Sequence, residues 1–421
     1  MHLTEYHLEH IITAMRAVLP LRQPADAILR HYFQAEHLGS RERALVAETV
    51  FGVLRHRLFL EHACTPTPSA HATPRRMALA YWIRFGGLNL RELEPLLKKD
   101  EVNWLGTIKG IALDELPLSI RAELPEWIIE KLRESMSDDD ILTLGRSMQN
   151  PAALDLRVNT FLSARDEVLR QFVSEGVEAT ATPWSPIGIR LKHKPALNKH
   201  QLFLSGKVEV QDEGSQLLGF LLAPKRNDMV VDFCAGAGGK TLLLGAMMNS
   251  QGRLYAFDIS EKRLANLKLR LKRSGLSNLH PQLIAHENDQ KIKRLAGKID
   301  RVLVDAPCSG MGTLRRNPDL KFRQSPESVD ELTQKQASIL ASASKLLKPG
   351  GRLVYATCSL LPQENRAIVD AFLAAHPAFT LRPANEILAQ HLIELDTGPY
   401  LQLSPQLHGT DGFFAAVMER S

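Results

Sequence analysis

The sequence predicts an α/β protein with several domains, in which helices form the first third and a parallel sheet covered by helices forms the last part. Three patterns carry this prediction. Apolar residues before position 140 recur at helical spacing, residues 154–158 alternate between apolar and polar side chains, and strand-like runs alternate with helical runs from about residue 205. Such an alternation of strands and helices is typical of a parallel sheet with helices on both faces.

Residues 1–140 are expected to be helical. The apolar side chains of Leu8, Ile11 and Met15 are three or four positions apart, which places them on one face of a helix. Stripes of similar spacing follow at Ile28–Phe33 and Ala44–Leu54. These stripes predict amphipathic helices that pack around a shared core.

A small sheet domain is expected after residue 150, where the pattern changes. Leu154–Val158 alternates like a half-buried strand, and Val168–Val173 returns to helical spacing. Further strand candidates lie near residues 177–182 and 188–192. The order β-α-β-β predicts a compact α+β domain.

Two cysteines in the last part of the chain follow the ends of strand-like runs. Cys308 comes after Arg301–Val304 and Asp305, and Cys358 comes after Arg352–Ala356. If the two strands are neighbours in a parallel sheet, both thiols reach its carboxyl edge, where open α/β sheets bind ligands. Two thiols beside a carboxylate suit covalent catalysis. The spacing alone leaves open which cysteine would attack a substrate.

A glycine-rich loop follows the strand candidate Met229–Phe233 and runs from Cys234 to Thr241 into a helix. Glycines allow the backbone to pass close to a bound cofactor, and a helix N-terminus offers free N–H groups. A dinucleotide, a nucleotide triphosphate and S-adenosylmethionine therefore compete as ligands of this loop.

Each of these ligands fits part of the loop. A dinucleotide site would use Gly236 and Gly238, but Thr241 stands where the third glycine belongs. A phosphate-binding P-loop would use the Gly-Lys-Thr run that ends at Thr241, but Cys234 stands at its first glycine. S-adenosylmethionine needs a close backbone approach and a carboxylate at the next strand end, which Asp258 supplies.

The composition is that of an ordinary soluble protein. Of 421 residues, 44% are hydrophobic and 24% are charged, and the net charge of +5 permits a nucleic-acid partner without requiring one. The four cysteines form no Cys-x-x-Cys pair, which favours free thiols in a reducing cytoplasm. We expect no signal peptide and no membrane span. We also expect no metal site, because no cysteine or carboxylate pattern supports His2, His7 and His10 as ligands.

Several segments, taken in order, resemble one enzyme family. These are Gln211–Gln216, Cys234–Thr241, Asp305–Gly312, Arg315–Asp319 and Ala356–Ser359. They are similar to the S-adenosylmethionine-dependent RNA (cytosine-5) methyltransferases of the RsmB/Nop/NSUN family, and most to bacterial RsmB-like rRNA methyltransferases. The resemblance covers residues 150–421 well. One departure is that the chain lacks the proline of the Ala-Pro-Gly-Gly-Lys sequence usual in the loop.

The resemblance implies three domains. Residues 1–145 would form an all-α NusB-like RNA-binding domain, and residues 146–204 a small RRM-like α+β domain. Residues 205–421 would form a Rossmann-like class I methyltransferase domain with a mostly parallel seven-stranded sheet.

The resemblance also implies a role for individual residues. Cys358 would be the nucleophile, Cys308 would assist breakdown of the adduct, Asp305 would contact the cytosine, and Lys240 would anchor the same site. Arg315 and Arg316 would bind RNA phosphates. The residues implied to bind S-adenosylmethionine are Cys234, Ala235, Gly236, Ala237, Gly238, Gly239, Lys240, Asp258, Asp289 and Asp305.

The implied function is transfer of a methyl group to carbon 5 of a cytosine in RNA through a covalent cysteine–cytosine adduct. The helical first third loosely resembles that of RsmB, which favours 16S rRNA as the substrate and a monomeric enzyme. A tRNA substrate and a non-catalytic role in ribosome assembly are the alternatives, and a P-loop ATPase is a rival from another class.

Overall fold

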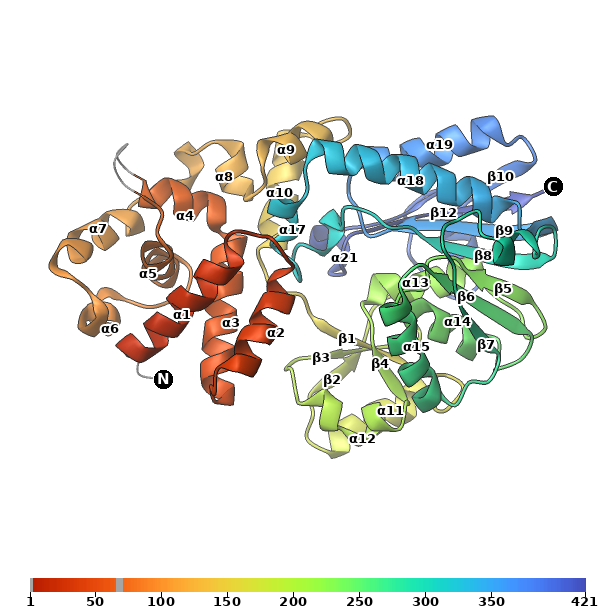
Figure 1. The fold of residues 1–421 in the computed structure, drawn as a ribbon, viewed down its shortest axis with the longest axis horizontal. Helices are drawn as coiled ribbons and strands as arrows, with labels where there is room; N and C mark the ends of the chain where they lie inside the picture. Colours follow the sequence, from red (N-terminus) through yellow and green to blue (C-terminus); the bar gives the residue numbers. More distant parts are fainter. Residues whose placement is uncertain (1–2, 66–70) are drawn as a thin grey trace. The chain divides into compact units, whose positions relative to one another are not determined.

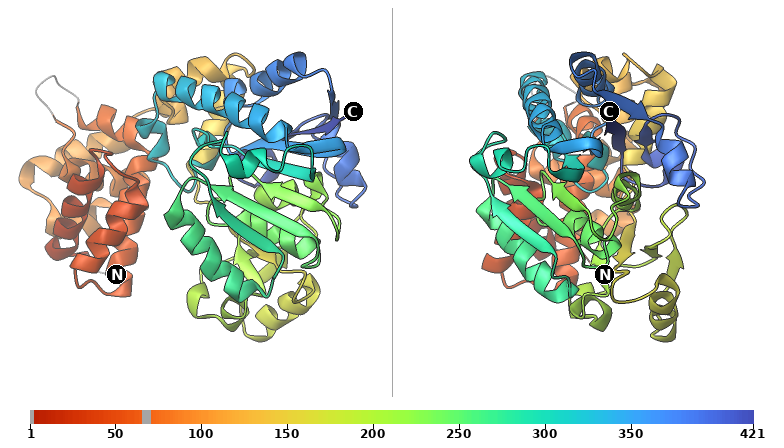
Figure 2. Two further views of the ribbon diagram at one scale, coloured as in Figure 1. Left: turned by 45° about the vertical axis from the view of Figure 1, so that its right-hand side comes forward. Right: turned by 90° about the vertical axis from the view of Figure 1, so that its right-hand side faces the viewer.

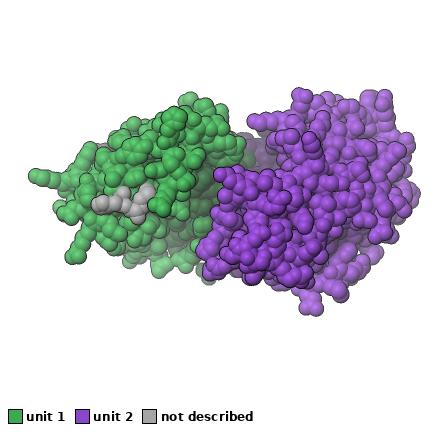
Figure 3. Space-filling model, turned by 90° about the horizontal axis from the view of Figure 1, so that it is seen from below, with its two compact units in different colours: residues 1–151, 313–326 green, residues 152–312, 327–421 purple. Residues whose placement is uncertain are grey.

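The computed structural model describes residues 3–65 and 71–421 (Figure 1). The chain divides into two compact units, shown in two colours in Figure 3. The first consists of residues 1–151 and 313–326, and we call it the helical unit. The second consists of residues 152–312 and 327–421, and we call it the sheet unit.

The helical unit is built from amphipathic helices, as the apolar stripes predict. Leu8, Ile11 and Met15 are fully buried in its core together with Val50 and Leu54. Its main helices are α1 (Glu5–Val18), α2 (Ala25–Ala35), α3 (Ser40–Arg55), α4 (Arg57–Cys64), α5 (Pro74–Arg84), α7 (Lys99–Lys109), α8 (Leu118–Ala122), α9 (Glu126–Leu132) and α10 (Asp138–Met148). None of the helices in the described ranges is both long and apolar enough to cross a membrane.

Residues 313–326, with the short helix α17 (Leu320–Arg323), pack into the helical unit although they lie inside the range 205–421 of the expected third domain. The buried ammonium of Lys321 donates to the main-chain carbonyls of Arg55 and Glu123, at 2.9 and 2.7 Å. The main-chain N–H of Ala25 donates to the Asp319 carboxylate at 3.2 Å. The helices therefore supply the partners that these buried polar groups need.

The first part of the sheet unit is a small antiparallel sheet of order β2-β3-β1-β4. Helix α11 (Arg165–Ser174) covers it and contributes Val168 and Phe172 to a separate small core. The strands are β1 (Leu154–Val158), β2 (Ala179–Ala181), β3 (Gly188–Leu191) and β4 (Val208–Val210). The first three match the expected strands. Strand β4 lies beyond residue 204, the expected domain end, and pairs with β1 through Leu156 and Val210.

The second part is a large, mostly parallel sheet (Figures 1 and 2), as predicted. Within the described residues its order is β10-β12-β9-β8-β5-β6-β7, and β11 adds an eighth strand beside β12. Strands β9, β8, β5, β6 and β7 are parallel, whereas β12 runs antiparallel to β9 and to β10. The strands are β5 (Met229–Asp232), β6 (Arg253–Asp258), β7 (Leu279–Leu283), β8 (Ile299–Asp305), β9 (Leu347–Thr357), β10 (Phe379–Arg382), β11 (Leu401–Leu403) and β12 (Phe413–Arg420).

Helices cover both faces of the large sheet because successive strand residues point to opposite sides. Val230 packs on one side with α13 (Glu213–Leu222) and α14 (Gly239–Met247). Its neighbour Val231 packs on the other side with α18 (Pro326–Ser344) and α19 (Arg366–Ala375). Figure 1 shows these two helices along the same face of the sheet. A third helix, α15 (Glu261–Ser274), lies beside α14 and packs on β6 and β7.

The strand order reverses at β5. Strands β6 and β7 follow it on one side, whereas β8 and β9 lie on the other. The carboxyl ends of these parallel strands form the crevice in which doubly wound sheets bind ligands. The fold thus directs the residues after β5, β6, β8 and β9 toward one place.

Candidate active site

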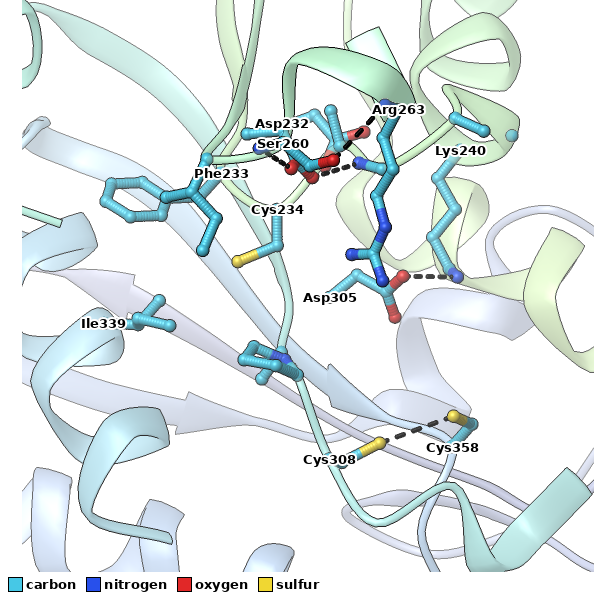
Figure 4. Close-up of a pocket in the computed structure, with 18 of the residues that line it drawn as sticks. Asp232, Phe233, Cys234, Lys240, Ser260, Arg263, Asp305, Cys308, Ile339 and Cys358 are labelled. Atoms are coloured by element: carbon cyan, nitrogen blue, oxygen red, sulfur yellow. Dashed lines mark hydrogen bonds and ion pairs between the residues drawn. The ribbon is translucent and has the colours of Figure 1, made fainter. Parts of the chain in front are cut away.

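The structure brings the two predicted thiols together. Strands β8 and β9 pair in parallel, with Asp305 beside Ala356, so that the segments after both strands leave the sheet at the same level. The Sγ atoms of Cys308 and Cys358 lie 3.4 Å apart, and both thiols are free (Figure 4).

A cavity of about 780 Å³ lies above this edge of the sheet unit. Its volume is within the range of roughly 300–1,000 Å³ that is usual for small-molecule sites. It is lined by Cys308 and Cys358 at one side and by the glycine-rich loop at the other. The lining also includes Gln211, Asp232, Asp258, Arg263, Glu287, Asp305, Lys335 and Ile339.

The glycine-rich loop has the backbone that only glycine adopts easily. Gly236 and Gly238 have positive φ angles of 55° and 84°. A Cβ at Gly238 would lie 2.6 Å from the side chain of Leu267, whereas one at Gly236 would meet no atom within 4 Å. Gly238 therefore permits close packing on α15, and Gly236 leaves room on the cavity side before α14 begins at Gly239.

Asp258 ends β6 and holds the loop in place. Its carboxylate accepts the main-chain N–H of Gly236 at 2.8 Å and that of Ser260 at 2.7 Å. The same carboxylate lines the cavity. Asp258 can thus both fix the loop and face a ligand, since each carboxylate oxygen can accept more than one hydrogen bond.

Lys240 and Asp305 form an ion pair between the glycine-rich loop and the end of β8. The Nζ atom of Lys240 lies 2.7 Å from Oδ2 of Asp305 (Figure 4). Burial opposes the charge of Lys240, but Asp305 outweighs this effect, and together with the nearby Cys358 it raises the pKa of the lysine. Lys240 therefore stays protonated beside the thiols.

The two thiols are not equivalent. The hydrogen bond with Cys358, burial and the charge of Cys358 raise the pKa of the Cys308 thiol well above its ordinary value. Cys308 therefore keeps its proton at neutral pH. Because a nucleophilic cysteine must act as a thiolate, the raised pKa argues against Cys308 as the attacking residue.

Asp232 belongs to the site, although sequence reasoning passed over it. It ends β5, is 1% exposed and lines the cavity. Its Oδ2 accepts a hydrogen bond of 2.7 Å from the Thr241 hydroxyl, whereas its buried Oδ1 has no hydrogen-bond partner within the described residues. Burial raises the pKa of Asp232 to about 7. The Thr241 hydrogen bond lowers this pKa, whereas the charge of Asp305 raises it further. Its position directly before the loop was the available signal.

Two groups of predicted residues lie elsewhere. Asp289 does not line the cavity, because its carboxylate accepts the main-chain N–H groups of Ala285 and Lys291 and so caps the short helix α16 (Gln290–Lys293). Glu287 lines the cavity instead and accepts a hydrogen bond of 2.6 Å from Ser338.

Arg315 and Arg316 also lie outside the cavity lining, in segment 313–326 of the helical unit. The main-chain carbonyl of Arg315 accepts a hydrogen bond of 3.0 Å from the Arg55 guanidinium, and Arg315 is 8% exposed. Their expected contact with RNA phosphates stays a prediction.

Comparison with known proteins identifies the family. The model of the family described as 16S rRNA methyltransferase RsmB/F matches residues 219–419, and that of the RsmF/B-like ferredoxin-like domain matches residues 124–198. A probable ribosomal RNA small subunit methyltransferase B from Synechocystis is 32% identical, over 94% of this chain and 95% of its own length.

The chain belongs to the RsmB/F methyltransferase family. The ribosomal RNA small subunit methyltransferase B of Sodalis glossinidius is 30% identical, over 99% of this chain and 98% of its own. The crystal structure of PH0851 superimposes with a TM-score of 0.80 at 25% identity and covers both chains fully. The resemblance read from the sequence is confirmed, and the protein is an RNA methyltransferase with the expected Rossmann-like fold.

The raised pKa of Asp232 predicts a pH-dependent stability. A carboxyl whose folded-state pKa is near 7 stabilises the fold fully below its unfolded pKa near 4, and this contribution is lost as the pH rises through 7. We expect the free energy of unfolding of the wild type to fall by up to about 4 kcal/mol relative to Asp232→Asn between pH 4 and pH 8. Urea denaturation of both proteins across this range measures the difference, and parallel curves would contradict the assignment.

Proposed function

We propose that this RsmB/F family member methylates carbon 5 of a cytosine in 16S rRNA, with S-adenosylmethionine as the methyl donor. The observation that carries the proposal is the pair of thiols 3.4 Å apart in the cavity that the glycine-rich loop also lines. Carbon 5 of cytosine is a weak nucleophile, and a thiolate bound to carbon 6 raises its electron density. A cysteine beside a donor pocket meets this requirement.

The glycine-rich loop and its neighbours fit S-adenosylmethionine. The open space at Gly236 admits a ligand close to the backbone, and the Asp258 carboxylate at the end of β6 suits the ribose hydroxyls. The unpartnered Oδ1 of Asp232 offers an acceptor for the ammonium of the amino acid part. When bound, S-adenosylmethionine supplies an electrophilic methyl group.

Two rival ligands of the loop are less compatible with these contacts. A P-loop lysine must reach phosphates, but the Lys240 ammonium is paired with Asp305 and is turned toward the thiols. A dinucleotide site would need a glycine where Thr241 stands, and the Thr241 side chain is buried and donates to Asp232.

The thiols divide the reaction between them. The Cys358 thiolate attacks carbon 6, which forms the S–C6 bond and activates carbon 5. Once Cys358 is bonded to carbon 6, Cys308 loses its own proton to solvent. After methylation, the Cys308 thiolate takes the proton of carbon 5, the electrons of that C–H bond form the C5–C6 double bond, and the S–C6 bond breaks with its electron pair returning to Cys358. Cys308 serves this second stage, because bonding of Cys358 to carbon removes the hydrogen bond and the charge that raise the pKa of Cys308. Asp305 holds the cytosine, and Lys240 holds Asp305.

The substrate assignment rests on the relatives named as small-subunit rRNA methyltransferases, which this chain matches over nearly its whole length. We expect bisulfite sequencing to find a 5-methylcytosine in 16S rRNA that disappears when the gene is deleted and returns with the wild-type copy. Loss of a tRNA mark in place of the 16S mark would overturn the rRNA assignment, and an unchanged methylation map would overturn the function.

Replacing the proposed nucleophile tests the chemistry. Cys358→Ala should lower the single-turnover methylation rate by about 10³-fold or more, because the remaining thiol, Cys308, has a raised pKa and is a poor nucleophile. Transfer of a radiolabelled methyl group to 16S rRNA measures the rate. Cys64→Ala removes a thiol from the core of the helical unit and should leave the rate unchanged. A Cys358→Ala enzyme within tenfold of the wild type would exclude this nucleophile.

Replacing the second thiol should trap the adduct. Cys308→Ala retains the nucleophile but lacks the group assigned to breakdown, so that protein joined to RNA should accumulate. A denaturing gel of the enzyme with labelled RNA detects the slower-migrating band, and Cys308→Ala/Cys358→Ala should abolish it. Full turnover without any such band would remove Cys308 from the mechanism.

A further inference from the structure

A buried carboxylate outside the cavity lining connects the segments that carry the two thiols. Glu364 ends the 3₁₀ turn Pro362–Glu364, which follows β9, and it is fully buried. Its Oε1 accepts the main-chain N–H of Ser309 at 2.8 Å and the side-chain amide of Gln336 at 3.0 Å. Its Oε2 accepts the hydroxyls of Ser309, at 2.5 Å, and of Ser359.

The two serines that bind the Glu364 carboxylate are the residues next to the two thiols. Ser309 directly follows Cys308, and Ser359 directly follows Cys358. One side chain therefore fixes the residue after each thiol, across the gap between the ends of β8 and β9. The hydroxyl oxygens of Ser309 and Ser359 are also 3.2 Å apart, so that both serines and Glu364 form one cluster.

The chemistry of the cluster requires a carboxylate. Every partner of the Glu364 side chain is a hydrogen-bond donor, and an ionised carboxylate accepts all of them with charge-assisted bonds. A glutamine of the same shape would present an NH₂ group to two of these donors. The described residues give Glu364 no ion pair, so that its burial depends on these hydrogen bonds.

The chain around Cys358 is held from further sides. Asn365 accepts the Thr357 hydroxyl at 2.5 Å and donates to the Ser359 carbonyl at 2.9 Å. The main-chain N–H of Gly312 donates to the carbonyl of Cys358 at 2.8 Å. The Cys358 segment is thus fixed by its neighbours, and Glu364 adds a side-chain connection that bonds to both Ser309 and Ser359.

We propose that Glu364 is a positioning residue that holds the Sγ atoms of Cys308 and Cys358 in contact through Ser309 and Ser359. The inference rests on the proposed function in one respect: the second thiol must reach the adduct that the first one forms. Glu364 does not line the cavity, and we assign it an action through the distance between the two sulfur atoms. Its charge also contributes to the raised pKa of the Cys308 thiol, so that removing the charge alone would speed thiol oxidation and not slow it.

A thiol-oxidation assay measures this distance without any RNA. Diamide takes two electrons and two protons from Cys308 and Cys358, which become a disulfide while diamide is reduced to the hydrazine. Sulfur atoms 3.4 Å apart need only a small shift to reach the bond length of about 2.05 Å. The rate is followed by mass spectrometry of the linked peptides.

Glu364→Gln should form the disulfide at least tenfold more slowly than the wild type. Glu213→Gln is the matched control: Glu213 is equally buried in the sheet unit, but it accepts the main-chain N–H groups of Trp184 and Ser185 far from the thiols in the sequence. A wild-type oxidation rate in Glu364→Gln, or an equal slowing in both variants, would overturn the proposal. Glu364 would then only stabilise the fold in general.

Two further measurements keep the result interpretable. If Glu364→Gln does not fold, Ser359→Ala removes one of the four hydrogen bonds and should slow oxidation by a smaller factor, and an unchanged rate would again overturn the proposal. With RNA, Glu364→Gln should lower kcat at least tenfold at an unchanged KM. Absence of methylation by the wild type would reject the proposed function, whereas the oxidation assay would still decide the role of Glu364.

Discussion

The parallel pairing of β8 with β9 is the constraint on which the site depends. The register that sets Asp305 beside Ala356 makes the two strands end together, so that the segments after them start at one level of the sheet. Cys308 and Cys358 are 50 positions apart in the sequence, and only this pairing makes them neighbours. The central position of β5 then adds the glycine-rich loop from the other side of the crevice.

Around this edge, acidic and basic side chains are mixed. Asp232, Asp258 and Asp305 end three neighbouring parallel strands and line one cavity, and Lys240 pairs with Asp305. Arg263, Arg270 and Lys335 line the same cavity, so that its wall offers partners of both signs to the charged groups of the proposed donor. At the other side of the cavity, the hydrogen bond with Cys358 is the largest cause of the raised pKa of the Cys308 thiol.

Features that follow a spacing pattern could be predicted from the sequence, whereas pairings and roles that depend on a tertiary partner could not. The helical stripe around Leu8 and the paired cysteines follow rules of spacing, and the structure contains both features. Strand β4 has only three residues, too few for any periodicity, and its pairing with β1 is a tertiary interaction. Asp232 stands directly before the glycine-rich loop, which was a usable signal, whereas the role of Glu364 becomes visible only with its partners in space.

Conformation of the connecting segments also decided which acidic residue faces the cavity. Asp289 and Glu287 are two positions apart, but the turn that Asp289 caps directs its carboxylate to main-chain N–H groups. The packing of residues 313–326 with helices far earlier in the chain could not be predicted from the sequence either. The residue types of Arg315 and Lys321 do not indicate which distant groups will contact them.

Segment 313–326 also has a consequence for how the polypeptide reaches its final state. The helices before residue 151 leave the ribosome first, yet the part of their unit that satisfies Ala25 and Arg55 is synthesised only after residues 152–312. The N-terminal unit is therefore discontinuous in the chain and cannot be completed while translation of the sheet unit is still at β8. Folding of the helical unit is thus coupled in time to synthesis of the sheet unit, and a cut at residue 151 would separate the helices from the segment 313–326 that completes their unit.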